Sequence, residues 1–318
     1  MESSDAIRML LAAGMRVTPI DRAHFRSDDG RIIVRSRLTR RPTPANVRSE
    51  LSRLNASEFI LFAVDSTTAS LVDAARSDHR IVLASGSDNA VWLDGERIDV
   101  GDVVRHTPAW TGRGPKPYVR FALLRALLTE ARPLTQLRLS EMTGVSQPAV
   151  SYALRGLDRF VQKASRSWIL GNPAKAFDYA CDAYPGTGGI DTYWWSDAPL
   201  EEQVGRAVGD IGHLVSGDLA ARAINAWRIP EHATVYSRTG VDLSERGFAA
   251  GTPADYTLAL TVPDDQTIWS TAGQGAIADP VIAAWDVKRT GTTGDQDEAA
   301  DMIRKKVLRT FSEGVARR

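Results

Sequence analysis

Residues Leu139–Leu157, LSEMTGVSQPAVSYALRGL, have the pattern of two short helices joined by a tight turn. Gly144 stands where the first helix must end, because glycine tolerates the left-handed conformation of a helix C-terminus. Ser146 is a typical N-cap for the second helix. Pro148 falls in its first turn, where the missing N–H of proline costs least. The stretch therefore predicts a helix, a turn and a second helix.

The second helix is expected to have two different faces. Its apolar residues repeat with helical spacing and predict a buried stripe formed by Val150, Leu154 and Leu157. The opposite face is expected to be exposed and is formed by Gln147, Ser151, Tyr152 and Arg155. In a DNA-binding helix-turn-helix, the first helix braces the second, whose N-terminal part enters the major groove. The pattern favours that function, although an ordinary helical hairpin within a core is the alternative.

Charge is unevenly distributed along the chain, although 39 basic and 39 acidic residues give a net charge of zero. Residues 105–172 carry 11 Lys and Arg against 3 Asp and Glu. Residues 1–104 carry 14 against 15, and residues 173–318 carry 14 against 21. The positive excess coincides with the predicted helix-turn-helix, as expected for a module that binds phosphates.

The residues after the second helix predict a β-hairpin. Arg159–Leu170, RFVQKASRSWIL, fits a strand, a polar turn and a returning strand. With the helix expected over residues 118–130, this hairpin would complete a winged helix. Lys163 and Arg166 would lie at the wing turn and, together with Ser146, would hold phosphates.

The two flanking segments predict α/β domains. Residues 1–104 follow the order β-α-β-α-β and then a hairpin with an Asp94-Gly95 turn, which favours a partly parallel sheet. Residues 173–318 also mix helices and strands, and a helix is expected over Leu200–Leu214 with Gly205, Gly209 and Gly212 on one face. The expected fold is a multi-domain α/β chain: a central winged helix-turn-helix, residues 105–172, flanked by two α/β domains.

Catalytic patterns in the flanking domains are weak. Asp65 follows a strand, but a metal-dependent nuclease needs further carboxylates and a lysine nearby, and residues 1–104 contain no lysine. Gly273-Gln274-Gly275 resembles part of a dinucleotide fingerprint without the βαβ unit that should frame it. The five histidines lack metal-ligand spacing. We therefore expect no catalytic residues, metal or cofactor.

The sequence also bears on where in the cell the protein is expected to act. No apolar run approaches the ~20 residues of a membrane helix, and the N-terminus has no basic region before its short apolar run. Cys181 is the single cysteine, so no intrachain disulfide can form. These features favour a cytoplasmic protein that does not act at a membrane.

Two C-terminal stretches carry a family resemblance: VSGDLAARAINAWRIPEHATVYSR, residues 215–238, and ADPVIAAWDVKRTGTTGDQDEAADMI, residues 278–303. With the central helix-turn-helix, they resemble the AbiEi-like antitoxins of type IV toxin–antitoxin systems. The likeness runs from about Ile81 to the end, and the N-terminal domain is longer than in the simplest members. The resemblance implies repression of the protein's own promoter through the winged helix, and a C-terminal domain that neutralises a cognate toxin.

Taken together, these patterns predict a sequence-specific DNA-binding transcriptional regulator, an antitoxin-type repressor. Its partners would be double-stranded DNA and a cognate toxin, and a homodimer would fit a palindromic operator. One alternative is a nuclease- or nucleotidyltransferase-like enzyme that the winged helix delivers to nucleic acid. The other is an adaptor whose winged helix binds protein.

Overall fold

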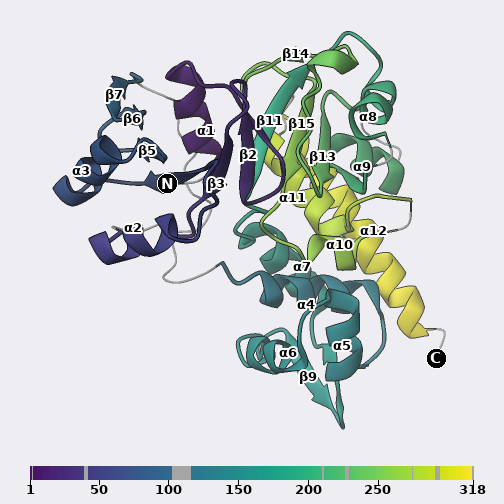
Figure 1. Cartoon of the computed structure of the whole chain (residues 1–318). Coiled ribbons are helices and arrows are strands. Elements are labelled where there is room, and N and C mark those ends of the chain that lie inside the picture. Colours follow the sequence, from purple (N-terminus) through teal and green to yellow (C-terminus); the bar gives the residue numbers. More distant parts are fainter. Residues whose placement is uncertain are drawn as a thin grey trace.

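A computed structural model describes residues 1, 3–38, 42–101, 116–209, 211–225, 229–273, 275–290 and 294–316. Over these residues the chain is a mixed α/β protein with 12 α-helices and three sheets (Figure 1). We refer to the described parts of residues 1–101 as the N-terminal unit, to Tyr118–Leu170 as the central unit and to Pro173–Ala316 as the C-terminal unit. No described helix combines the length and apolar character needed to cross a membrane.

The N-terminal unit contains a seven-stranded sheet whose strands lie in sequence order. The strands are β1 (Val17–Pro19), β2 (His24–Ser27), β3 (Ile32–Arg35), β4 (Glu58–Val64), β5 (Ile81–Ser85), β6 (Ala90–Leu93) and β7 (Glu96–Asp99). β3, β4 and β5 are parallel and the other pairs are antiparallel, so the predicted partly parallel sheet is confirmed. The hairpin turn also forms as predicted, with positive φ at Asp94 and Gly95.

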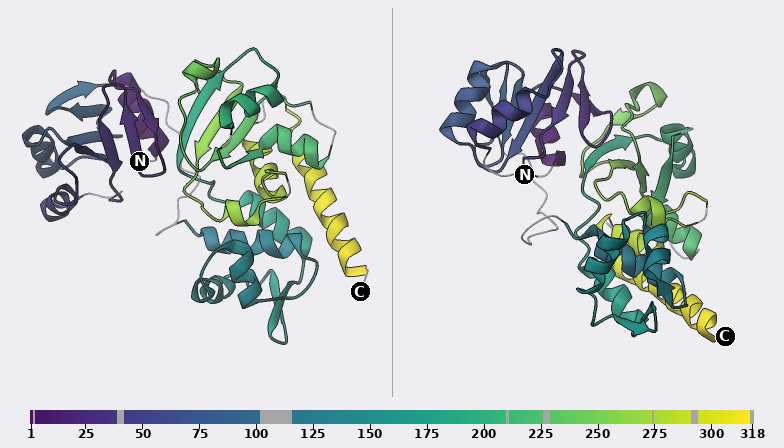
Figure 2. Two further views of the ribbon diagram at one scale, coloured as in Figure 1. Left: turned by 45° about the vertical axis from the view of Figure 1, so that its right-hand side comes forward. Right: turned by 60° about the horizontal axis from the view of Figure 1, so that its bottom comes forward.

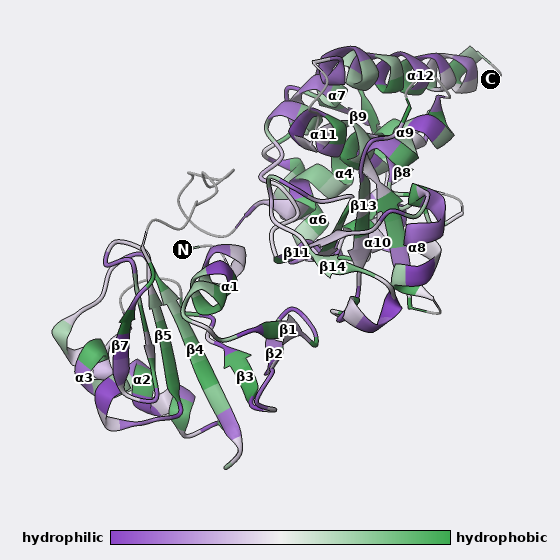
Figure 3. Cartoon of the chain, turned by 90° about the horizontal axis from the view of Figure 1, so that it is seen from above, coloured by the Kyte–Doolittle hydropathy of each residue, from purple (hydrophilic) through white to green (hydrophobic). Residues whose placement is uncertain are grey.

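Helices cover both faces of this sheet. They are α1 (Ser3–Ala12), α2 (Pro44–Leu51) and α3 (Ala69–Ser77). α1 packs on one face, and α2 and α3 pack on the other, which leaves the central strands buried on both sides. Figure 3 shows the resulting hydrophobic character along β4 and β5. The N-cap of α3 is Thr68, whose side chain accepts from the backbone N–H of Leu71.

The central unit contains a three-stranded sheet in the order β8-β10-β9 and three helices. Its elements are α4 (Tyr118–Thr129), β8 (Leu134–Thr135), α5 (Gln136–Thr143), α6 (Gln147–Leu154), β9 (Val161–Ala164) and β10 (Ser167–Leu170). Gly144 ends α5 with φ +67°, as its position predicted. The β9–β10 hairpin lies at the extremity of the molecule, beyond α5 and α6 (Figures 1 and 2).

The C-terminal unit contains a five-stranded sheet in the order β12-β13-β15-β11-β14, in which only β13 and β15 are parallel. Its strands are β11 (Ile190–Trp195), β12 (His213–Ser216), β13 (Ala233–Ser237), β14 (Ala249–Ala250) and β15 (Leu258–Val262). Its helices are α7 (Pro173–Asp182), α8 (Leu200–Val208), α9 (Gly217–Ile224), α10 (Ile268–Thr271), α11 (Pro280–Thr290) and α12 (Gln296–Ala316), with a short 3₁₀ turn at Ser244–Arg246.

One expected helix is shorter than predicted. α8 ends at Val208, and Gly209 follows it with φ +47°. Residues from His213 onward form β12, so Gly209 and Gly212 lie outside the helix. The prediction that the three glycines share one helical face is therefore wrong.

Two hydrophobic cores extend across the predicted domain boundaries. One runs from α4–α6 and the β9–β10 hairpin into α7, α11 and α12, and so passes through the expected boundary at residue 172. The other lies under α1 and also includes Ile190 of β11 and Val262 of β15. The central unit therefore shares its interior with the C-terminal unit, which in turn contributes to the core of the N-terminal unit.

Candidate nucleic-acid interface

The surface of α6 divides as its sequence predicted. Val150 and Leu157 are fully buried and Leu154 is 3% exposed. On the opposite side Gln147 and Arg155 are exposed, and Ser151 is half-buried. The Tyr152 side chain is 76% exposed, which is unusual for an aromatic residue in a folded chain. Most of the predicted recognition residues are thus open to solvent, with an aromatic ring among them.

The N-terminus of α6 is open. Ser146 occupies the N-cap position with extended backbone, but its side chain makes no capping hydrogen bond. Ser146, Gln147 and Pro148 are all exposed. The first N–H groups of a helix have no partners within the helix, so an open N-terminus is suited to an anionic oxygen.

The β9–β10 hairpin presents two of the predicted phosphate contacts. Lys163 is exposed on β9 and pairs across the hairpin with Trp168. Arg166 is exposed in the turn, next to Ser165, whose φ is +58°. Trp168 is partly buried against the core. Its packing fixes the hairpin to the body of the central unit and leaves the cations outside.

Three cations on the predicted face have no ion-pair partner. In the part of the chain that the structure describes, Arg155, Lys163 and Arg166 take part in no ion pair, whereas Arg132 and Arg138 are paired with Glu130 and Glu141. Unpaired positive charge is therefore present on α6 and the hairpin, and Arg159 between them is also exposed and without an ion pair in the described part of the chain.

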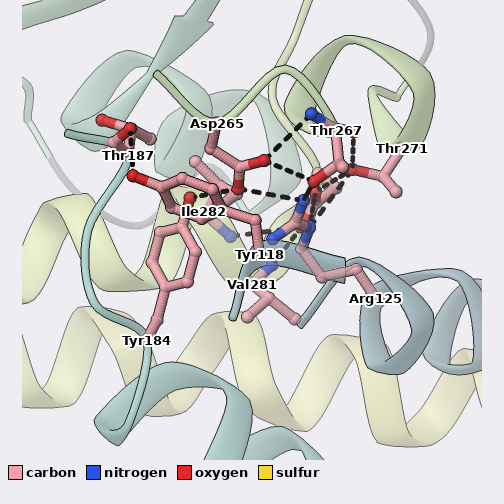
Figure 4. Close-up of polar contacts among 10 residues, drawn as sticks. Tyr118, Arg125, Tyr184, Thr187, Asp265, Thr267, Thr271, Val281 and Ile282 are labelled. Atoms are coloured by element: carbon pink, nitrogen blue, oxygen red, sulfur yellow. Dashed lines mark hydrogen bonds and ion pairs between the residues drawn. The ribbon is translucent and has the colours of Figure 1, made fainter. Parts of the chain in front are cut away.

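A buried ionic cluster behind this surface was not predicted (Figure 4). Arg125 of α4 is 1% exposed, although the positive excess of residues 105–172 had counted it as surface charge. Its Nε lies 3.0 Å from a carboxylate oxygen of Asp279, and its Nη2 lies 3.6 Å from Asp265. Nη2 also donates to the hydroxyl of Thr267 at 2.7 Å, and Nε donates to Thr271 at 3.2 Å.

Both carboxylates of this cluster, Asp265 and Asp279, also accept hydrogen bonds from other residues. Tyr184 donates its hydroxyl to Asp265 at 2.6 Å, and burial together with that carboxylate raises the Tyr184 pKa well above its usual value. Asp279 accepts hydrogen bonds from the backbone N–H groups of Val281 and Ile282 and so caps α11. Burial raises the pKa of Asp279, while the adjacent guanidinium of Arg125 opposes the shift.

The sequence contained a signal for this cluster. Arg125 interrupts the apolar run FALLRALL in a helix whose neighbouring residues are all buried. An arginine in such a position has to meet a carboxylate, because an unpaired buried charge is very costly. Its partners lie more than 130 residues away along the chain, so they could not be assigned from spacing.

A second buried carboxylate, Asp286, lies within α11 itself. Asp286 accepts the hydroxyls of Ser216 and Tyr236, each at 2.6 Å, and Arg289 at 3.0 Å. All three of these hydrogen-bond donors belong to the C-terminal unit. Asp286 therefore connects α11 to β12 and β13 through hydrogen bonds.

The residues considered for catalysis are not brought together. Asp65 is paired with the amino group of Met1 at 2.6 Å, and its side chain is 83% exposed. Within the described ranges, no group of three or more His, Cys, Asp or Glu residues is placed to hold a metal ion. Gln274 of the glycine-rich stretch lies outside the described residues.

Comparisons of the chain with protein-family models, with curated proteins and with solved structures found no match.

Proposed function

We propose that the central unit is a winged helix and that this chain is a sequence-specific DNA-binding transcriptional regulator. The order α4-β8-α5-α6-β9-β10, with a sheet in the order β8-β10-β9, supports the winged-helix assignment. In this proposal α6 is the recognition helix, and the β9–β10 hairpin is the wing beside it.

Each predicted contact residue would have a role that suits its side chain. Arg155 would read guanine, and Gln147 would read adenine, because these pairings match the hydrogen-bonding edges of the bases. Ser151 and Tyr152 would complete the base-contacting face. Phosphates would be held by Ser146, Lys163 and Arg166.

We further propose that the chain is an antitoxin-type repressor of the cytoplasm. This part rests on the resemblance of residues 215–238 and 278–303 to AbiEi-like antitoxins. The repressor would bind its own promoter, and the C-terminal unit would bind the cognate toxin. Two copies would occupy a palindromic operator.

The observation that carries the proposal is the coincidence of three unpaired cations, an exposed tyrosine and an open helix N-terminus on one small unit. The test begins with a duplex that the wild-type chain selects from a random-sequence library, referred to below as the selected duplex. A triple substitution, Arg155→Ala with Lys163→Ala and Arg166→Ala, should abolish binding to it.

A charge-matched control separates a defined interface from general electrostatics. Arg26, Arg48 and Arg76 are exposed arginines of the N-terminal unit, and replacing all three with alanine removes the same charge. The control should retain nearly all of its affinity for the selected duplex. Equal losses in the two triple variants, or failure of the wild-type chain to enrich any sequence, would overturn the proposal.

A further inference from the structure

The connection between β15 and α11, described over residues 263–273 and 275–279, contacts all three units. Arg35 of β3 donates to Asp264 at 3.3 Å. Ile277 forms a β-bridge with Val215 of β12. α10, within the connection, lies against α4 and α5 (Figure 1). This short segment is therefore a junction between the candidate interface and the rest of the chain.

The junction contacts the central unit at two places that adjoin α6. Arg125 is held between Asp265 and Asp279, and the helix that carries it, α4, packs against α6. The other place is the turn before α6, where a Cβ added at Gly144 would lie 2.5 Å from Oγ of Ser270. A shift of the junction would therefore move both α4, which packs against α6, and the turn that precedes α6.

The chemistry of the cluster suits orientation better than stability. Burying an ion pair costs so much desolvation that a well-packed apolar replacement is often as stable. A guanidinium, however, is a rigid planar fork whose bonds form in one geometry only. Arg125 uses Nε and Nη2 toward two carboxylates and two threonine hydroxyls, so a small rotation of α4 would break several bonds together.

We propose that Arg125, Asp265 and Asp279 are positioning residues for DNA recognition, and that they hold α6 in one orientation relative to the remainder of the chain. This inference rests on the proposed DNA binding. Arg125 is 1% exposed and cannot contact DNA itself, so any effect it has on sequence discrimination must act through α4 and α6.

The test compares the selected duplex with a random duplex for Arg125→Met in the full chain. We expect about a tenfold or larger loss of affinity for the selected duplex, with affinity for the random duplex and its salt dependence unchanged. Arg125→Lys should recover part of the loss because it restores the charge. The matched control is Arg132→Met, at an exposed arginine paired with Glu130.

Stability is measured alongside, because a purely structural role would lower the melting temperature and leave both affinities of the folded protein intact. That result would overturn the inference and leave the proposed function standing. If Arg125→Met does not fold, Thr271→Val decides, since it removes only the hydroxyl that accepts from Arg125 and donates to Asp279. Unchanged discrimination in Thr271→Val would then contradict the inference, whereas a wild-type chain that binds no duplex contradicts the proposed function.

Discussion

Arg155 and Lys163 carry the same charge but occupy different elements of the proposed interface. Arg155 ends α6, and Lys163 lies on β9 beside the hairpin turn. Arg155→Ala should weaken binding to the selected duplex by about 1–3 kcal/mol and relax the preference at one base pair. Lys163→Ala should weaken binding to all sequences alike and reduce the slope of log affinity against log salt by about 1.

Fluorescence-anisotropy titrations of both variants at several salt concentrations, on the selected duplex and on duplexes with single base-pair changes, distinguish these effects. A uniform loss in Arg155→Ala across all duplexes would remove it from base recognition. A sequence-dependent loss in Lys163→Ala would place it in the groove instead of on the backbone.

Asp88 offers a test of how hydroxyl donors stabilise the N-terminal unit. Its carboxylate accepts from Ser85 and, at 2.9 Å, from Thr67. The Ser85 hydrogen bond is the main cause that holds the Asp88 pKa below its usual value; partial burial opposes it. Because the folded pKa lies below the unfolded one, the carboxylate stabilises the fold above the unfolded pKa, and this contribution is lost as pH falls through the folded pKa.

Asp88→Asn should therefore lower the free energy of unfolding by about 1 kcal/mol at neutral pH, and by progressively less as the pH falls through the folded pKa of Asp88. Urea unfolding over a series of acidic pH values and at neutral pH measures the difference. Asp73→Asn on the exposed side of α3 is the control for a lost surface charge. A deficit that persists undiminished in acid would mean that the ionised carboxylate is not the stabilising form.

The turn between α5 and α6 is constrained both by its backbone conformation and by a close neighbour. Gly144 combines a positive φ of +67° with close approach of Ser270, whereas Gly30 has φ +89° and no atom within 4 Å of an added Cβ. Gly30→Ala thus reports left-handed backbone strain alone, which costs about 1–2 kcal/mol. Gly144→Ala should cost more, because the added methyl group also displaces Ser270.

Denaturant midpoints of the two glycine variants give the comparison. Adding Ser270→Gly to Gly144→Ala should restore the part of the loss that is due to the steric contact. Equal losses at Gly30 and Gly144, with no recovery in the double variant, would show that the turn does not press against α10.

The elements were predictable where a local rule determines them. The α5–α6 turn follows from Gly144 and Pro148, and β4 follows from an apolar run between polar ends. β1 and β2, of 3 and 4 residues, were not predicted. The expected extension of α8 failed because Leu214 and Val215 continue an apolar pattern that a strand satisfies equally well.

The candidate site divides in the same way. Its solvent-facing half was predicted residue by residue, since the polar face of α6 is the complement of a helical stripe. The buried half was not predicted, because the partners of Arg125 come from a distant connection that only tertiary packing brings near α4. Local sequence patterns predict where a side chain lies on its own helix or strand. They do not predict which distant residues it contacts.

At the scale of the whole molecule, the two shared cores bear on how the chain unfolds. The central and C-terminal units have one interior, and Ile190 of β11 lies, fully buried, in the core of the N-terminal unit. Elements that share a core lose it together, so we expect one calorimetric transition whose measured enthalpy equals its van't Hoff enthalpy.

Substitutions of three buried isoleucines, each in a different part of the two shared cores or the remaining one, test this coupling. Ile60→Ala in the N-terminal unit and Ile282→Ala in the C-terminal unit should each lower the free energy of unfolding by about 2–5 kcal/mol. Each should move the same single transition to a lower temperature. Ile190→Ala should act differently, because it removes packing at the junction of the units. We expect its transition to broaden or split, with the strands of the N-terminal unit losing hydrogen-exchange protection first. If wild-type protein already shows two separate transitions, and Ile60→Ala moves only one of them, the cores contribute to stability independently and the α1–β11 contact does not couple them.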